Sequence, residues 1–450
     1  MKIHCIGIGG IGVSALARYY LAKGFEVTGS DLYDSEIIQE LKKAGTIIKT
    51  GKQIPENIPL DVDVIIYSAA VQEDNLEMQQ ARNLKKVNPG LKLLSYAQAL
   101  GELTRDYFTI AVSGTHGKST TVSMLSLILI KAGLDPMVIM GTKLREFGNS
   151  NFRLGGGKYL VIEADEWQGS FLNYYPQVIV LTNIEEDHLD YYRDLQHINE
   201  TYHSYLEKLS SEGILIYNKD DKNLAKIASI CNAGTKISFS SEQKEAKKIS
   251  EIIKIPGEHN IRNALAALNA AKALGVSKEI SYQAIGEYQA CWRRFDQRRA
   301  FVNNQDVLLI HDYAHHPTEV KALFQTLEEK FKNRRIYFIF QPHQYQRVFY
   351  FFDRFVQAFQ ENHNNNNEYH VIIVDIYDVP GREQACLKNK VDASKLVKAI
   401  NRPNIIYCPL DKLINFLSKN IEQNDIIVAA GAGDIYRWAT DLQPEDGNYY

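Results

Sequence analysis

The segment from Gly114 to Ser119 carries the most specific chemistry in the sequence. It reads Gly-Thr-His-Gly-Lys-Ser and lies between an apolar stretch, residues 108–112, and a helix expected from Lys118 to about residue 132. Glycines let backbone N–H groups turn toward an anion, and the helix N-terminus adds partial positive charge. The lysine reaches the terminal phosphates of a nucleotide, and the serine hydroxyl suits Mg²⁺. The sequence therefore predicts an ATP site at Gly114, Thr115, His116, Gly117, Lys118, Ser119 and Thr120.

A second glycine-rich loop, Gly7-Ile-Gly-Gly-Ile-Gly12, follows the first apolar stretch and precedes an amphipathic helix. Asp31 ends the next expected strand about twenty residues on, which is the spacing of a dinucleotide fingerprint. The physical requirement is only a close backbone approach at a helix N-terminus, so NAD, FAD and a nucleotide-sugar diphosphate all fit. The sequence predicts a diphosphate site here and leaves its ligand open.

Acidic residues and histidines follow several of the expected strands. They gather in residues 163–166, 182–190, 311–319 and 340–347. Ligands of a parallel sheet bind beyond the carboxyl ends of its strands, so we expect the first two segments near Lys118. Oxygen ligands suit Mg²⁺, and a neutral imidazole such as His188 can join them. For Asp165, Glu185 and Glu186, helix capping is an equally good explanation. The spacing of the adjacent histidines in 311–319 is wrong for a helical zinc pair, so we expect no catalytic zinc.

Three blocks of alternating strand and helix patterns must position these residues. Such alternation indicates right-handed βαβ units and parallel sheets, and a length of 450 residues fits about three domains. We expect an α/β fold with a Rossmann-like domain at 1–107, a central P-loop domain at 108–297 and a Rossmann-like domain at 298–450. The expected strands are residues 2–8, 26–29, 62–68, 91–94, 108–112, 159–162, 178–182, 307–311, 335–340, 370–375 and 425–430. A polar loop is expected at 364–367.

The composition excludes several classes of protein. A formal net charge of −3 and a charged fraction of 23% do not favour nucleic acid or an anionic membrane as a partner. The five cysteines form no C-x-x-C pair, as is typical of reduced thiols in a cytosolic protein. The longest apolar run is about half of what a membrane span needs. We therefore expect a soluble cytoplasmic protein.

In this order, these motifs resemble the Mur ligase family over nearly the whole chain. The matching segments are GIGGIG with GSD at 29–31, YSAAV at 67–71, GTHGKSTT at 114–121, EADE at 163–166, SFL at 170–172, TNIEEDHLD at 182–190, GEHNIRNALAA at 257–267, WRRFD at 292–296, HDYAHHPTE at 311–319, FQPHQYQR at 340–347 and GAGD at 431–434. The resemblance implies an ATP- and Mg²⁺-dependent carbon–nitrogen ligase of peptidoglycan precursor synthesis. Its implied substrates are UDP-N-acetylmuramate, activated as an acyl phosphate, and L-alanine.

The resemblance also implies roles for individual residues. Lys118, His188, Arg294 and Asp312 are implied to be catalytic, and Ser119, Glu163 and His188 to bind Mg²⁺. Asn260, Asn263 and Arg294 would contact ATP, although the asparagines could cap a helix and the arginine could be a surface ion-pair residue. The UDP-sugar would lie on Gly7, Gly9, Gly10, Ile11, Gly12, Asp31 and Ser68. The amino acid would face His315, His316, His343 and Arg347.

The sequence departs from the family pattern at three places. Trp167 and Gln168 stand where the family's EADESD has serine and aspartate, and Gln344 stands where its QPHRYTR has arginine. A glutamine matches a carboxylate less well than an arginine fork does, so glycine or L-serine is also conceivable as the substrate. The segment at 237–257 is too short for the extra strands usual there, which predicts a trimmed edge of the central sheet.

Several alternatives remain at this point. A related ligase could add another amino acid, a recycled tripeptide or, on folate, glutamate. A dehydrogenase explains the Gly7–Gly12 loop but leaves Lys118 and Glu163 without a role. A non-catalytic nucleotide switch explains the Gly114–Ser119 loop alone. For the oligomeric state we expect a monomer or a weak homodimer.

Overall fold

The computed structural model describes residues 1–361, 367–379, 383 and 385–442 of the chain, so only the last residue of the expected polar loop at 364–367 is included. The described residues form two compact units. The first comprises Met1–Glu185, Leu195–Ile253 and Ile261–Tyr288, and the second comprises Glu186–Asp194, Lys254–Asn260 and Gln289–Tyr450. Together the units hold three sheets, as predicted; the domain boundaries near 107 and 297 stay predictions.

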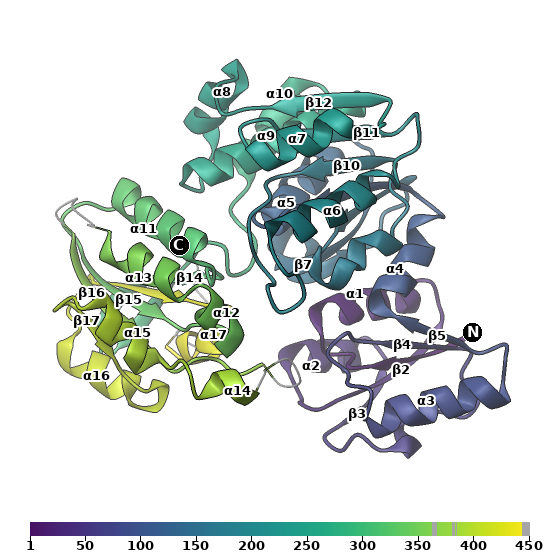
Figure 1. Cartoon of the computed structure of the whole chain (residues 1–450), viewed down its shortest axis with the longest axis horizontal. Helices are drawn as coiled ribbons and strands as arrows, with labels where there is room; N and C mark the ends of the chain where they lie inside the picture. Colours follow the sequence, from purple (N-terminus) through teal and green to yellow (C-terminus); the bar gives the residue numbers. More distant parts are fainter. Residues whose placement is uncertain (362–366, 380–382, 384, 443–450) are drawn as a thin grey trace. The chain divides into compact units, whose positions relative to one another are not determined.

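The first sheet has five parallel strands in the order β3-β2-β1-β4-β5, as expected for a Rossmann-like domain (Figure 1). Its core includes Ile6 and Ile65 from the strands, packed with Met78 and Ala81 from helix α3. In chain order the elements are β1 (Lys2–Ile6), α1 (Ile11–Ala22), β2 (Glu26–Asp31), α2 (Glu36–Lys43), β3 (Ile47–Thr50), the 3₁₀ turn η1 (Pro55–Asn57), β4 (Val64–Tyr67), α3 (Leu76–Val87), β5 (Lys92–Ser95) and α4 (Tyr96–Thr104).

The second sheet, in the same unit, has seven strands in the order β12-β11-β10-β6-β9-β7-β8. Its elements are β6 (Phe108–Ser113), α5 (Lys118–Lys131), β7 (Met137–Leu144), η2 (Arg145–Phe147), β8 (Ser150–Arg153), β9 (Tyr159–Glu163), η3 (Trp167–Asn173), β10 (Val178–Leu181), α6 (Leu195–Leu206), β11 (Ile214–Asn218), α7 (Lys222–Ile230), β12 (Thr235–Phe239), α8 (Lys244–Ile252), α9 (Glu258–Ala273) and α10 (Lys278–Glu287). Val112 pairs with Glu163, and Ser113 pairs with Leu181. The carboxyl ends of β6, β9 and β10 therefore lie side by side, which brings their following loops together.

The third sheet, in the second unit, has the order β13-β14-β18-β15-β16-β17. Its elements are β13 (Asp296–Val302), β14 (Gln305–Asp312), α11 (Pro317–Lys330), β15 (Arg335–Phe340), α12 (Tyr345–Tyr350), α13 (Phe352–Gln360), β16 (Glu368–Ile373), α14 (Ala385–Lys388), α15 (Ala393–Ile400), β17 (Ile405–Tyr407), η4 (Leu410–Lys412), α16 (Leu413–Asn420), β18 (Ile426–Ala430) and α17 (Ile435–Thr440). Phe324 of α11 and Phe355 of α13 pack on one face, and Leu417 of α16 and Ile435 of α17 on the other. This helix–sheet–helix layering can be followed in Figure 1.

Antiparallel hairpins at two sheet edges depart from the predicted parallel arrangement. Strand β8 runs antiparallel to β7, and β13 runs antiparallel to β14. In the second hairpin Val302 pairs with Gln305, and the intervening Asn303 and Asn304 both have positive φ, at 49° and 63°. Asparagine tolerates this conformation, and a two-residue turn of this kind joins adjacent antiparallel strands directly. The strands absent from the prediction are β3, β7, β8, β11, β12, β13 and β17.

The segment at 237–257 contains the end of β12 and helix α8, with no further strand. Because β12 is the edge strand of the second sheet, this agrees with the trimmed edge predicted there. Among the helices of the described residues, none combines the length and the apolar character needed to cross a membrane.

Candidate active site

The Gly114–Ser119 loop joins β6 to α5 and requires glycine at two positions. Gly117 has φ 84°, and a Cβ there would lie 2.2 Å from Oδ1 of Asn263. Gly114 has φ 135°, and a Cβ there would lie 2.1 Å from Oγ1 of Thr182. Side chains from two other segments therefore occupy the space that a larger residue would need. One of them, Asn263, is a predicted ATP-contacting residue, and the structure places it against the loop.

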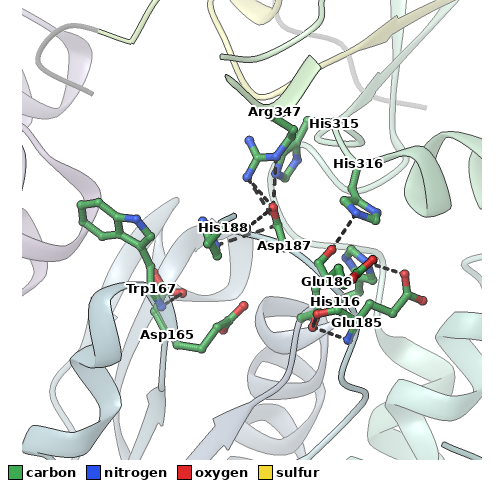
Figure 2. A network of polar contacts seen from close by, with 12 residues as sticks. His116, Asp165, Trp167, Glu185, Glu186, Asp187, His188, His315, His316 and Arg347 are labelled. Atoms are coloured by element: carbon green, nitrogen blue, oxygen red, sulfur yellow. Dashed lines mark hydrogen bonds and ion pairs between the residues drawn. The ribbon is translucent and has the colours of Figure 1, made fainter. Parts of the chain in front are cut away.

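The residues after β10 hold the loop in position. The Thr182 hydroxyl and the Asn183 amide both donate to the carbonyl oxygen of His116, at 2.6 and 2.9 Å. The backbone N–H of His116 donates to Oδ1 of Asn183 at 2.9 Å, and its ring lies 3.7 Å from the Glu185 carboxylate (Figure 2). The backbone of His116 thus anchors the loop, a role that the sequence did not reveal.

Lys118 is enclosed by acceptors. Its Nζ donates to Oε2 of Glu166 at 2.8 Å and to the carbonyl oxygens of Gly114 and Thr115 at 2.7 and 3.3 Å. Burial alone lowers the pKa of Lys118, but the charges of Glu166 and Asp165 outweigh it and raise the pKa above its usual value. Burial raises the pKa of Glu166 to about 8, against the opposing effect of Lys118. The ammonium of Lys118 thus lies directly against the buried carboxyl group of Glu166.

Glu166 belongs to the quoted EADE motif but was not predicted as a site residue. Its side chain is 4% exposed and forms an ion pair with Lys118. The available signal was its position just after β9, the strand next to β6. A carboxylate that follows the neighbouring strand meets the lysine that begins α5.

Ser119 and Glu163 form the second polar pair of this sheet edge. The Ser119 hydroxyl lies 2.9 Å from each carboxylate oxygen of Glu163, and the backbone N–H of Gly141 donates to Glu163 at 2.8 Å. A hydroxyl beside a carboxylate is an all-oxygen donor set of the kind that Mg²⁺ prefers. These two residues therefore fit the predicted metal. The third predicted ligand, His188, belongs to the second unit.

The two residues that depart from the family pattern follow Glu166 directly. Trp167 is buried, and its backbone N–H donates to Oδ1 of Asp165 at 3.3 Å (Figure 2). Gln168 is exposed and has φ 52°. Here the chain has a buried indole and an exposed amide in place of a hydroxyl and an acid.

The Gly7–Gly12 loop brings together most of the predicted diphosphate-binding residues. It follows β1, and Gly10 caps the start of α1. The backbone N–H of Gly9 donates to Oδ2 of Asp31 at 2.8 Å, and a Cβ on Gly7 would lie 2.9 Å from Cβ of Ser68. Asp31 and Ser68, which end β2 and follow β4, thus hold the loop from both sides.

Asn151 of β8 was not predicted to take part in this loop. Its amide donates to the carbonyl oxygen of Ile11 and, at 3.0 Å, to the hydroxyl of Ser14. It therefore ties the first turn of α1 to the second sheet of the same unit. No local sequence signal marked this contact, because the two partners are 140 residues apart.

In the second unit, Arg347 of α12 forms a buried ion pair with Asp187. Its Nη2 lies 3.0 and 3.3 Å from the two carboxylate oxygens, and its Nε lies 3.2 Å from Oδ1 (Figure 2). Burial alone raises the pKa of Asp187, but Arg347 and the nearby histidines outweigh it and hold the pKa well below its usual value. Nη1 of Arg347 also lies 3.1 Å from Nδ1 of His343 and donates to Oε1 of Gln344 at 3.3 Å. Asp187 was not predicted as a site residue.

The adjacent histidines have different surroundings. His316 is fully buried and caps α11, because its Nδ1 accepts from the Thr318 backbone N–H. Its Nε2 lies 3.1 Å from the carbonyl oxygen of Glu186 (Figure 2). Because both ring nitrogens contact backbone groups, His316 stabilises the start of α11 and its contact with residue 186. His315 instead lies against the ring of His343, with 5.8 Å between centroids.

Asp312 and Arg294 lie where β14 ends. Asp312 accepts the backbone N–H groups of Phe295 and Ala314, both at 2.8 Å, and burial raises its pKa to about 6. Arg294 lies 3.5 Å from Glu319. Asp312 therefore fixes the backbone of the segment that carries Arg294.

Two further residues in this unit have structural contacts. Arg293, which was not predicted, is buried with φ 60° and donates to the carbonyl oxygens of Gly431 and Gly433. The amide of Asn260, a predicted ATP contact, donates to the carbonyl oxygen of Pro256 at 2.6 Å. Asn260 thus stabilises the first turn of α9.

The fold and these sites define a class: an α/β enzyme with a nucleotide phosphate loop, a separate diphosphate loop and a third sheet bearing a buried arginine. Comparison with known proteins identifies the family. Residues 2–108 match the Mur ligase family catalytic domain, residues 112–271 the Mur ligase middle domain, and residues 293–433 the Mur ligase glutamate ligase domain. The chain belongs to the Mur ligase family.

Individual relatives cover nearly the entire chain. A UDP-N-acetylmuramate–L-alanine ligase of Acetivibrio thermocellus is 38% identical over 97% of this chain and 94% of its own. The enzyme of the same name from Clostridium kluyveri is 33% identical over 97% and 96%. The crystal structure of UDP-N-acetylmuramate-alanine ligase from Thermotoga maritima is similar with a TM-score of 0.78, 25% identity and 98% coverage of both chains.

Proposed function

We propose that this protein is an ATP-dependent ligase that joins L-alanine to the carboxylate of UDP-N-acetylmuramate in peptidoglycan precursor synthesis. The observation that carries the proposal is the arrangement at the end of β6, where Lys118 begins α5 and Ser119 lies 2.9 Å from Glu163. Relatives with this activity in their names match the chain at 33–38% identity over almost its full length, which supports the choice of substrates.

The chemistry requires charge neutralisation and positioning more than acid–base catalysis. A carboxylate oxygen of the muramoyl group attacks the γ-phosphorus of ATP, and ADP leaves. The amine of L-alanine then attacks the acyl carbon, and the tetrahedral intermediate expels phosphate while the amine loses its proton to solvent. Lys118 and the N–H groups of residues 114–119 hold the phosphates and offset their charge.

For Mg²⁺, Ser119 and Glu163 are the proposed ligands, with His188 assigned to a second ion. When bound, the ion offsets the negative charge of the phosphate oxygens. The Gly7–Gly12 loop, with Asp31 and Ser68, is proposed to hold the diphosphate of the UDP-sugar. This assignment accounts for a dinucleotide-type loop in an enzyme without a redox cofactor.

The remaining predicted residues receive their proposed roles from the same family pattern. Asn260, Asn263, Arg294 and Asp312 are assigned to the nucleotide side, with Asn263 supported by its approach to Gly117. On the amino-acid side, the proximity of His343 to Arg347 supports these two residues together with His315. A cytoplasmic location is proposed because ATP and free amino acids are cytoplasmic substrates, and the oligomeric state is proposed to be a monomer or a weak homodimer.

A related ligase activity, toward another amino acid or a recycled tripeptide, is the second candidate. The observation that favours it is Gln344, which replaces an expected arginine and directs its Oε1 toward Arg347.

The test is phosphate release from ATP with UDP-N-acetylmuramate and each of the twenty amino acids, or a tripeptide, in turn. We expect L-alanine to stimulate release most strongly. Preference for glycine, L-serine or the tripeptide would replace the assigned substrate, and no stimulation by any of them would refute the ligase proposal. Keto-acid reduction with NADH would instead identify a dehydrogenase.

A further inference from the structure

Gln346 has a buried carboxamide that the contacts described so far do not explain. The residue is 2% exposed, and neither Oε1 nor Nε2 has a hydrogen-bond partner among the described residues. Leaving such a group unpaired costs about 1–3 kcal/mol, and native proteins contain few of them. A retained group of this kind points to a polar partner that binds during function.

Gln346 is one of the residues that line a small pocket in the second unit. The pocket is lined by Asp187, His188, Gln344, Gln346, Arg347 and Tyr350. It therefore adjoins Arg347, the cation that we assign to the amino-acid substrate. The occupant of a pocket between this arginine and an unpaired amide should be small, polar and able to accept hydrogen bonds.

The other polar groups of the pocket limit what Gln346 can contribute. The charge of Arg347 is already matched by Asp187, so the guanidinium cannot neutralise a second carboxylate by itself. Gln344 directs its Oε1 to Nη1 of Arg347. The Nε2–H groups of Gln346 are neutral donors that the described residues leave unused at this pocket. An ionised carboxylate accepts hydrogen bonds at both oxygens and needs several donors.

We infer that Gln346 is a substrate-binding residue whose Nε2–H group donates to the carboxylate of the incoming amino acid. The inference rests on the proposed function and adds a neutral donor beside Arg347. Because every amino acid carries this carboxylate, the contact sets affinity for amino acids in general. It does not distinguish their side chains.

The experiment compares Gln346→Leu and Gln346→Met, two variants of similar volume that lack the donor, with the wild-type enzyme. Phosphate release is measured with L-alanine, glycine and L-serine at saturating ATP and UDP-N-acetylmuramate. A hydrogen bond to a charged group corresponds to about a 10- to 100-fold change in KM. We expect the KM for all three amino acids to rise by the same factor, with kcat and the KM for ATP unchanged.

The other outcomes overturn the inference in different ways. An unchanged amino-acid KM with a raised melting temperature would mean that the amide is a structural defect that leucine repairs. A rise in the KM for L-serine alone would mean that Gln346 contacts the side chain of the amino-acid substrate and not its carboxylate. A wild-type enzyme that responds to no amino acid would overturn the proposed function, and this inference with it. If Gln346→Leu fails to fold, the same KM measurements on Gln346→Met test the inference.

Discussion

Replacing Gly117 by alanine tests whether Asn263 and the phosphate loop act together. The substitution has two separable costs. The first is the left-handed backbone, φ 84°, which costs an L-residue roughly 1–2 kcal/mol. The second is a collision, because the new Cβ would lie 2.2 Å from Oδ1 and 2.9 Å from Cγ of Asn263. Either Asn263 or the loop has to move.

The chain offers a matched control at the other end of the same helix. Gly133 follows α5 with φ 75°, and a Cβ there would meet nothing within 4 Å. Gly133→Ala therefore carries the backbone cost without the collision. A displacement of about 1 Å at a positioning group costs about 100-fold in rate. We expect Gly117→Ala to lower kcat/KM for ATP by about 100-fold and Gly133→Ala by less than about twofold.

The assay is ADP formation at saturating UDP-N-acetylmuramate and L-alanine, with the melting temperature of both variants measured alongside. A double-mutant cycle with Asn263→Ala completes the test, because removing Asn263 removes the collision. The double variant should then be no slower than Asn263→Ala alone. Equal losses in the two glycine variants, or fully additive losses in the cycle, would refute the reasoning.

Three further predictions concern single residues. Lys118→Ala should abolish turnover while leaving UDP-sugar binding by calorimetry nearly intact, because the phosphate loop and the Gly7–Gly12 loop are separate; loss of both would contradict that division. Gln344→Arg should lower the KM for the amino acid if this position faces its carboxylate, and an unchanged KM would mean that it does not. Burial lowers the pKa of His4 to about 4, so the unfolded chain binds more protons between pH 6.5 and 4 and stability falls as the pH drops. From pH 7 to 5 the loss is about 2 kcal/mol, and His4→Asn should remove it in urea unfolding; an unchanged pH dependence would show that the pKa of His4 is the same in the folded and unfolded states.

The sequence predicted the features that lie within one short segment. The Gly114–Ser119 and Gly7–Gly12 loops combine a strand end, glycines and a helix start, and each of these is a local property. The strands next to them were predicted because their apolar runs are continuous. The proximity of Glu163 to Lys118 and Ser119 was also predictable, because the order of βαβ units puts the ends of their strands at one edge of the sheet.

The features that were not predicted depend on contacts between distant residues. Edge strands such as β8 and β13 are short or half exposed, and their pairing is set by turns such as Asn303-Asn304. In the sequence Asp187 is one acid among several, and only the structure shows its ion pair with Arg347, which is 160 residues away. His316 looked like its neighbour, yet its backbone position makes it a helix cap. The type of a residue does not by itself reveal its partner across the fold or its place at a helix end.

Asp187 and Glu166 share a role that neither motif shows by itself. In each unit a cation assigned to an anionic substrate, Lys118 or Arg347, is already paired with a buried carboxylate. A buried charge without a partner is costly, so the acid keeps the cation ionised and fixed before any substrate arrives. The same acid weakens the cation's attraction for a substrate anion, so further hydrogen-bond donors are needed to bind that anion. Around Lys118 these donors are the N–H groups of a helix N-terminus. Around Arg347 the position that would have held a second arginine is Gln344, and the amide of Gln346 is the further donor that we infer there.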